Sequence, residues 1–243
     1  MAWHAQATGG YARTSTEAIE NATLLAQACY NIGWCKASVC AMLGNGAGES
    51  GLNPWRWQSD YVPTRSEMQA WTYNQSLQHG YGLFQFTPAN KYINSTNASA
   101  LSSYGYAPNF QDHAGNASDG NAQTVFFCGE VPNDWRPTDL YGYYYDDFIN
   151  IGVDISGWYY TNYNPFILGQ DNNGNTLTLY ELVGVFELNY ERPGDTYAAS
   201  SYSYRCDNAD YWWSTLPDPH PSIFQPWFLW MITTRYKRRW KFL

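Results

Sequence analysis

The chain has 243 residues, enough for one large domain or two small ones, and its net charge of −8 argues against a nucleic-acid-binding protein. It contains 22 Tyr, 12 Trp and 11 Phe, but only 14% of its residues are charged. Because Tyr and Trp carry a polar tip that needs water or a partner, this composition favours a lined groove or docking surface, and a Tyr-rich exterior of an extracellular or viral protein fits equally well.

Two helices are predicted near the N-terminus. The first covers residues 15 to 32, because Thr14-x-x-Glu17 matches a capping box and apolar residues recur at helical spacing behind it. Gly33 suits its end. The second helix covers roughly Lys36 to Leu43, and it delivers Glu49 at or just past its C-terminal end.

Glu49 lies in a glycine-rich run, GNGAGESGLNP, at residues 44 to 54. No basic residue is nearer in sequence than Lys36 or Arg56. Desolvation and the negative end of a helix dipole would both disfavour ionisation of this carboxyl group, and a protonated carboxyl is what a general acid needs. The glycines would let a bulky sugar chain approach the backbone. On composition alone, however, a solvated loop acid is the favoured interpretation.

The middle of the chain is rich in turn signals. Short strands or hairpins are expected around 70–86 within a polar, aromatic stretch over 52–111. Asp119 could cap a helix that runs through Cys128. Residues 131–175, which include VPNDWRPTDLYGYYYDDF and GQDNNGNT, are interpreted as a long, irregular, Tyr-rich insertion.

Two further helices are predicted in the C-terminal half. Thr178-x-x-Glu181 is a second capping box, which opens a helix ending near Tyr190. The last helix spans 199 to 216. Helices at both ends of one domain, with a smaller irregular or β region between them, indicate a mostly helical α+β domain over residues 1–216 with a cleft between its two parts.

The cysteines and histidines argue against metal and thiol chemistry. The five cysteines are odd in number and lack the spacing of a zinc site, so free buried thiols with at most one disulfide are favoured. A peptidase that pairs Cys128 with His79 or His113 is disfavoured, because Cys128 lies mid-helix after two Phe. The four histidines show no ligand spacing. No metal and no cofactor is implied, and the N-terminus shows no signal-peptide pattern.

Three short segments, read together, carry a family resemblance. They are ESGLNP at 49–54, GYGLFQF at 80–86 and FELNYERPG at 186–194. In this order and spacing, over roughly residues 15 to 216, the chain resembles the phage tail lysozyme family of the lysozyme-like superfamily, which includes goose-type lysozymes and soluble lytic transglycosylases. A lysozyme-like fold and cleavage of bacterial peptidoglycan follow as expectations.

The resemblance also implies roles for single residues. Glu49 would be the catalytic acid/base, Ser50 would orient it or the sugar's N-acetyl group, and Gln85 would bind substrate from the opposite wall of the cleft. Tyr190 would bring its hydroxyl to the acid or the sugar, although a core aromatic at a helix end explains it equally well. From the residues themselves, Trp55 and its neighbour Trp57 could offer ring faces to sugar; Tyr81, in the second segment, joins the substrate-binding set.

A second carboxylate would distinguish a hydrolase from a lytic transglycosylase. Between residues 50 and 111 the acids are Asp60 and Glu67, and Asp60 is the better catalytic candidate, although a solvated turn acid is the simpler explanation. The pair Glu187 and Glu191 is ambiguous, and an ion pair between Glu191 and Arg192 is favoured as a structural feature. The sequence leaves both reactions open, and both cut the β-1,4 bond between N-acetylmuramic acid and N-acetylglucosamine.

The C-terminal segment, 217–243, has a different character from the domain. A Pro-rich linker at 217–221 precedes an apolar block and then a basic one, which holds five of the 13 basic residues of the chain. The apolar part is too short to span a bilayer. The pattern predicts an amphipathic tail that anchors the enzyme to phage tail or virion proteins or to an anionic membrane surface, and packing back on the acidic domain is the alternative.

The expected protein is thus a virion-associated phage enzyme that opens the cell wall locally for DNA entry. An endolysin for host lysis is the nearest competitor. A catalytically inactive tail or cell-wall-binding protein is the alternative from another class.

Overall fold

The computed structural model describes residues 1–6, 8–60, 80–86, 117–137, 141–156, 161–192 and 195–219. Its helices in these ranges are α1 (Thr16–Asn31), α2 (Lys36–Ser50), α7 (Ala117–Asp134), α8 (Tyr141–Asn150), α9 (Tyr163–Ile167), α10 (Leu179–Phe186) and α11 (Asp195–Thr215), with a 3₁₀ turn at Gln58–Asp60 and a π-helical turn, η3, at Glu187–Glu191. The predicted mostly helical architecture is therefore confirmed.

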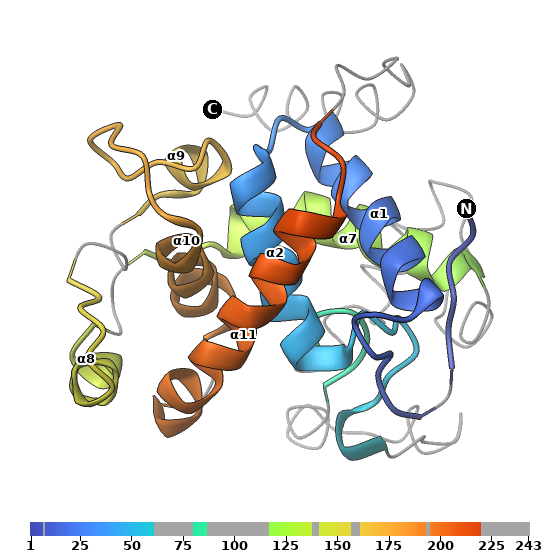
Figure 1. Ribbon diagram of the computed structural model, residues 1–243, viewed down its shortest axis with the longest axis horizontal. Helices are drawn as coiled ribbons and strands as arrows, with labels where there is room; N and C mark the ends of the chain where they lie inside the picture. Colours follow the sequence, from blue (N-terminus) through green and yellow to red (C-terminus); the bar gives the residue numbers. More distant parts are fainter. Residues whose placement is uncertain are drawn as a thin grey trace, which may run out of the picture.

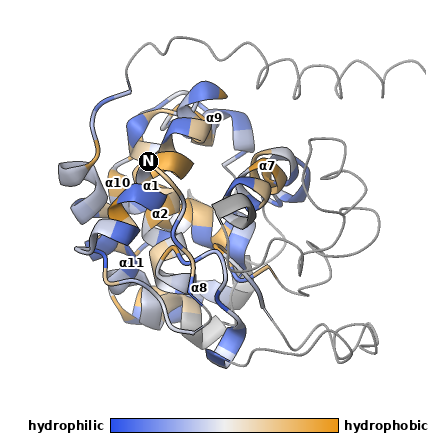
Figure 2. Ribbon diagram, turned by 90° about the vertical axis from the view of Figure 1, so that its right-hand side faces the viewer, coloured by the Kyte–Doolittle hydropathy of each residue, from blue (hydrophilic) through white to orange (hydrophobic). Residues whose placement is uncertain are grey.

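Helix α2 is the centre of the fold. Helix α11 crosses it, and α10 and α1 pack on it from other sides (Figure 1). Residues 38 to 47 of α2 are all buried. This burial explains why the side chains on nearly every side of the helix are small or apolar. Hydrophobic residues also mark α7 and the helices around α2 in Figure 2.

The cap of α1 differs from the prediction by one residue. Ser15, not Thr14, is the N-cap, and its hydroxyl accepts a hydrogen bond from the Ala18 backbone N–H at 3.1 Å. The helix ends at Asn31, and Gly33 follows with φ of +96°, a conformation that glycine adopts without strain. The predicted start and stop of the helix are otherwise confirmed.

The second predicted capping box, at Thr178 and Glu181, is confirmed in both directions. Helix α10 passes into the π-helical turn and the run ends at Glu191, after which Arg192 takes a left-handed conformation. The last helix, α11, begins four residues earlier than predicted, at Asp195. It buries Trp212 and leaves Trp213 about half exposed.

The middle of the chain has more helix than the sequence predicts. The segment 131–175 contains the end of α7 and the helices α8 and α9, so the prediction that it is irregular is wrong; its status as an insertion stays a prediction. Pro132 lies inside α7, whereas GQDNNGNT does form a turn between α9 and α10, closed by an isolated bridge between Gln170 and Thr176. Among the residues that the structure describes, β-structure is limited to isolated bridges such as Trp57 with Tyr81. Of the strands or hairpins predicted around 70–86, the part at 70–79 lies outside the described residues, and the part at 80–86 has an isolated bridge between Tyr81 and Phe86.

An aromatic core joins the 80–86 segment to α7 and α10. The rings of Phe84 and Phe127 stack with centroids 4.3 Å apart, and Phe186 and Tyr190 pack against both. Much of the high aromatic content is thus explained by the core, although Tyr180, Tyr204 and Trp213 are exposed.

All five cysteines are free thiols, as predicted, and four of them are buried while Cys35 is half-buried. Within the described ranges, no helix combines the length and apolar character that a membrane span requires. Residues 217–219 follow α11 without regular secondary structure, and the rest of the predicted linker and anchoring tail, 220–243, lies outside the described residues.

Candidate active site

Glu49 lies inside the last turn of α2, not in a loop. The helix continues through the glycine-rich run to Ser50 and is closed by Gly51, which has φ of +62°. The Glu49 side chain is 17% exposed, so part of it is accessible to solvent. The prediction that the second helix ends near Leu43 is therefore wrong, whereas the placement of Glu49 at a helix C-terminal end is confirmed.

The glycines of α2 accommodate neighbouring protein atoms. A Cβ at position 44 would lie 2.5 Å from the Arg205 carbonyl oxygen, and one at position 46 would lie 3.0 Å from the ring of Phe84. At position 48 it would meet the Arg205 side chain at 3.4 Å. Close packing of α11 and the 80–86 segment on α2 therefore explains Gly44 and Gly46. The expectation that the glycines let a sugar chain approach stays a prediction.

Arg205 of α11 supplies the cation that the sequence did not reveal. Its Nη2 donates to Glu49 Oε1, Nη1 donates to Asn45 Oδ1 at 2.9 Å and Nε donates to the Ser201 hydroxyl at 3.1 Å. The guanidinium is fully buried and carries a second ion pair, to Glu187 Oε1 at 2.9 Å. The premise that Glu49 has no cation nearby is therefore wrong.

Glu187, whose role the sequence leaves ambiguous, is a second functional candidate. Its side chain is fully buried at the start of η3, where Ser201 donates to Oε1 at 3.0 Å. Its other oxygen, Oε2, has no hydrogen-bond partner within the described part of the chain. Burial raises the pKa of Glu187 to about 7, although Arg205 and Ser201 oppose the rise. The sequence signal for this residue is an acid within an otherwise apolar helix face, FELNY.

Ser50 and Tyr81 are buried within the protein. The Ser50 hydroxyl donates to the Leu83 carbonyl at 2.8 Å and lies 3.3 Å from the Gly46 carbonyl oxygen, so it ties the 80–86 segment to the end of α2. Tyr81 is fully buried and its ring packs on Trp57 with centroids 4.5 Å apart. In this structure neither side chain is open to a substrate, and the alternative that Ser50 orients Glu49 stays a prediction.

Gln85 and Trp55 are half-buried on the neighbouring segments. Gln85 has a left-handed backbone with φ of +44°, and its side-chain amide donates to the Arg56 carbonyl at 3.0 Å and the Gly82 carbonyl at 3.1 Å. These bonds hold the turn that carries Gln85. Trp55 packs against the core while keeping part of its ring accessible.

Asp60 is exposed and holds the N-terminal segment. Its Oδ1 accepts a hydrogen bond from the Gly9 backbone N–H at 2.6 Å and lies 3.5 Å from Arg56 Nε. Asn53, fully buried, binds the same segment through the carbonyls of Gln6 and Gly9. These contacts give Asp60 a structural role that the sequence did not indicate.

Tyr190 donates its hydroxyl to a different acid from the predicted one. Its partner is Glu130 Oε2 on α7, at 2.8 Å. Burial, followed by the nearby Glu130 charge, raises the pKa of Tyr190 well above its ordinary value. Arg192, at the end of the same turn, pairs with Asp134 of α7 at 2.7 Å, so the ion pair predicted with Glu191 is not the one that fixes this turn.

Glu49 is thus a partly exposed carboxyl group whose position is fixed by the buried side chain of Arg205, which also pairs with Glu187. Glu49 can exchange a proton with a molecule outside, whereas Arg205 and Glu187 cannot reach one. Within the described residues, no group of three or more His, Cys, Asp and Glu side chains is arranged to hold a metal ion. The chemistry that this arrangement supports is proton transfer by a single, fixed carboxyl group.

Comparison with known proteins agrees with the resemblance. A family model described as phage tail lysozyme matches residues 20–216. The chain is also similar to a protein named Morphogenesis protein 1 of Bacillus phage B103, with 27% identity over 210 residues. That match covers 85% of this chain and 43% of the relative, so the chain spans less than half of the relative's length.

Proposed function

The chain belongs to the phage tail lysozyme family, and on this basis we propose that it cleaves the β-1,4 bond between N-acetylmuramic acid and N-acetylglucosamine in bacterial peptidoglycan. The observation that carries the proposal is Glu49, a partly exposed carboxyl group at the end of α2 whose partner Arg205 is fully buried. Glu49 is the proposed general acid, which protonates the bridging oxygen as the glycosidic bond breaks.

After that step the cation-like sugar is captured either by water, as in a muramidase, or by a hydroxyl of the substrate, as in a lytic transglycosylase. Both reactions start with the same proton transfer from Glu49. Trp55 and Gln85, which are half-buried near the end of α2, are the proposed sugar-binding side chains. Ser50 acts indirectly, because it fixes the 80–86 segment that carries Gln85.

We place the enzyme in the virion, where it would open the cell wall during DNA entry. Support comes from the relative in a Bacillus phage, which is named for morphogenesis, a name that favours a particle component over an endolysin. The proposed partners are phage tail or virion proteins, bound through residues 217–243, and an anionic membrane surface is the second partner proposed for this basic segment.

Digestion of purified peptidoglycan tests the reaction. Wild-type protein should release soluble fragments, and Glu49→Gln should lose this activity by about 100-fold or more. Asp207→Asn, which removes an exposed carboxylate from α11, is the matched control and should stay active. Cleavage by Glu49→Gln at the wild-type rate would refute the assignment.

Mass analysis of the fragments identifies the second half of the reaction. Fragments with 1,6-anhydro ends indicate a lytic transglycosylase, and reducing ends indicate a muramidase. The location is tested separately by removal of residues 220–243, which keeps the contact between Lys36 and Asp218. We expect peptidoglycan cleavage to persist and incorporation into phage particles to be lost.

A further inference from the structure

Among the described residues, side chains from three elements fix the Arg205 guanidinium. Asn45 and Glu49 of α2, Ser201 of α11 and Glu187 of η3 all contact it. Because the guanidinium is planar and its donors form a rigid fork, it cannot turn toward one carboxylate without losing bonds to the others. The bond between Glu187 and the guanidinium therefore also helps to fix the position of the Glu49 carboxyl group.

The charges in this cluster do not balance. One guanidinium faces two carboxyl groups, so ionisation of both leaves one negative charge uncompensated within the cluster. Burying such groups is costly, and apolar side chains of similar volume often stabilise a protein more than a buried ion pair does. Stability alone gives no reason for a fully buried Glu187, one oxygen of which has no hydrogen bond to the residues that the structure describes.

We infer that Glu187 is a positioning residue for Glu49: by sharing Arg205 with it, Glu187 fixes the Glu49 carboxyl group and divides the positive charge that this group meets. The inference deepens the proposed function, since it rests on Glu49 as the general acid. Glu187 itself cannot touch substrate, because its side chain is fully buried.

The direction of the effect follows from the charges. When Glu187 is ionised, Arg205 Nε is bound to a carboxylate other than Glu49, and a second negative charge lies behind the guanidinium. Both effects weaken the attraction between Arg205 and the Glu49 carboxylate, and both are absent when Glu187 is neutral. The raised pKa of Glu187, about 7, puts this change near neutral pH.

Other titratable groups near the pair do not explain this change. Cys206 of α11 stays neutral because burial raises its pKa to about 12, and burial also raises the pKa of Tyr202 well above its ordinary value. Glu191 of η3 adds a negative charge that acts on Arg205. Glu181 of α10 is held in its capping box. On the other elements packed against α10 and α11, the further charged groups within the described residues are Lys36 of α2 and Asp146 and Asp147 of α8.

Carbon-13 titration of the carboxyl groups tests the inference without any substrate. In protein labelled at glutamate side-chain carbonyls, with signals assigned through Glu49→Gln and Glu187→Gln, the Glu49 signal of the wild type should follow the ionisation of Glu187. In Glu187→Gln, the part of the Glu49 chemical-shift change that follows the ionisation of Glu187, here called the Glu187 component, should vanish. The Glu49 signal should then reach its ionised position at lower pH. Glu187→Asp, which keeps the charge, should restore the component, and Asp207→Asn should leave it as in the wild type.

A Glu49 titration that is the same in the wild type and in Glu187→Gln would overturn the inference. If Glu187→Gln does not fold, the titration of the wild type decides the question. A wild-type Glu49 signal that does not change as Glu187 ionises would also overturn the inference. The activity profile is the second measurement: Glu187→Gln should lose peptidoglycan cleavage at lower pH than the wild type while keeping it at acid pH. Absence of cleavage by the wild type would refute the proposed function and leave the titration result standing.

Discussion

The guanidinium of Arg205 donates to the carboxylate of Glu49 across 156 positions of sequence and joins α11 to the last turn of α2. This contact changes how the glycine-rich run is understood. The run is a helix whose small residues let α11 come close enough for a buried arginine to reach a carboxyl group at the surface.

Loss of Arg205 should be costly at neutral pH. In Arg205→Gln the fully buried Glu187 keeps Ser201 as a donor but loses its charge partner, and breaking a buried ion pair by removing one member typically costs about 3–5 kcal/mol. Chemical denaturation at pH 8 measures the loss. Arg136→Gln, which removes a largely exposed guanidinium, is the control and should change the stability by less than about 0.5 kcal/mol.

The pH dependence of stability should carry the signature of Glu187. Its pKa is raised from 4.5 to about 7 in the folded protein, so between these values the unfolded chain has released a proton that the folded chain still holds. Stability therefore falls as pH rises through this window, by up to about 1.4 kcal/mol per pH unit.

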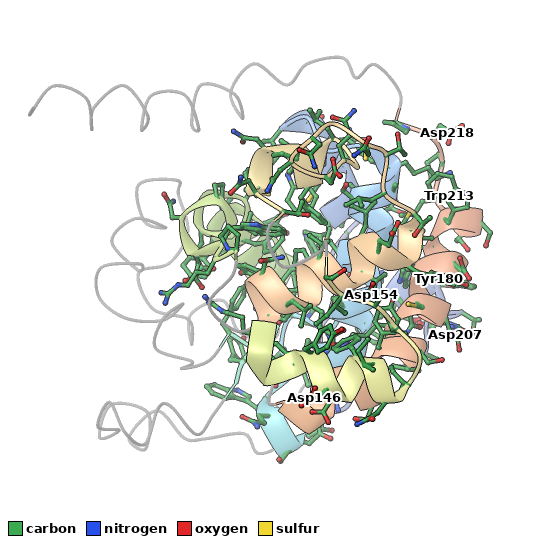
Figure 3. All side chains as sticks on the ribbon, turned by 90° about the vertical axis from the view of Figure 1, so that its left-hand side faces the viewer. Asp146, Asp154, Tyr180, Asp207, Trp213 and Asp218 are labelled. Atoms are coloured by element: carbon green, nitrogen blue, oxygen red, sulfur yellow. The ribbon has the colours of Figure 1, made fainter. Side chains whose placement is uncertain are left out.

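Denaturation curves at several pH values, compared between the wild type and Glu187→Gln, isolate this contribution. The variant should lack the decline between pH 4.5 and 7. Asp207 lies on the outer side of α11 (Figure 3), and Asp207→Asn should keep the wild-type slope. Equal slopes in the wild type and Glu187→Gln would mean that Glu187 does not titrate in this range.

Two glycines of α2 should respond in opposite ways to alanine. At Gly44 the new Cβ would lie 2.5 Å from a backbone oxygen of α11, so the helices must separate, and we expect a loss of about 1–3 kcal/mol. At Gly48 the Cβ would meet the Arg205 side chain at 3.4 Å, an ordinary contact, and alanine should stabilise the helix by up to about 1 kcal/mol.

Thermal unfolding and peptidoglycan cleavage of both variants check this prediction. If the glycines instead open a path for sugar, Gly48→Ala would stay stable and lose its activity. Retained activity in Gly48→Ala would show that the reaction does not need glycine at this position.

Local signals in the sequence predicted most of the helices, because capping residues and apolar spacing act over a few positions. The box at Thr178 and the end near Glu191 are examples. The run at 44–50 was misjudged because glycine propensity disfavours a helix unless neighbours need the space, and the neighbour that needs it, Arg205, is far away in sequence.

The candidate site was predicted only in its local part for the same reason. Glu49 could be found from its motif. Its cationic partner, Arg205, lies on another helix, and the second carboxyl group of the site, Glu187, lies in a mostly apolar segment. Ser50 and Tyr81 match family motifs, yet their side chains are turned into the core, which a motif does not show. Long-range pairing between side chains is the information that one sequence lacks.

Asp60 should prove structural, not catalytic. Its carboxylate already accepts from the Gly9 backbone and lies close to Arg56, and asparagine can accept the same backbone hydrogen bond. Asp60→Asn should therefore keep cleavage within about threefold of the wild type, whereas loss of a general base costs about 100-fold or more. A second variant, Asp60→Ala, should detach the N-terminal segment and increase proteolysis near Gly9. A 100-fold loss in Asp60→Asn with an intact fold would restore Asp60 as the second catalytic carboxylate.

Tyr190 should contribute to stability and not to the reaction. Its hydroxyl donates to Glu130, and hydrogen bonds to charged groups typically contribute about 1.5–3 kcal/mol, so Tyr190→Phe should destabilise the protein by about that amount. Tyr202→Phe is a matched comparison, because the Tyr202 hydroxyl donates to a neutral backbone carbonyl, a bond that contributes about 1 kcal/mol. Cleavage per folded molecule, measured well below both melting temperatures, should equal that of the wild type in both variants. A selective loss of kcat in Tyr190→Phe would instead place its hydroxyl at the sugar, as the family resemblance implies.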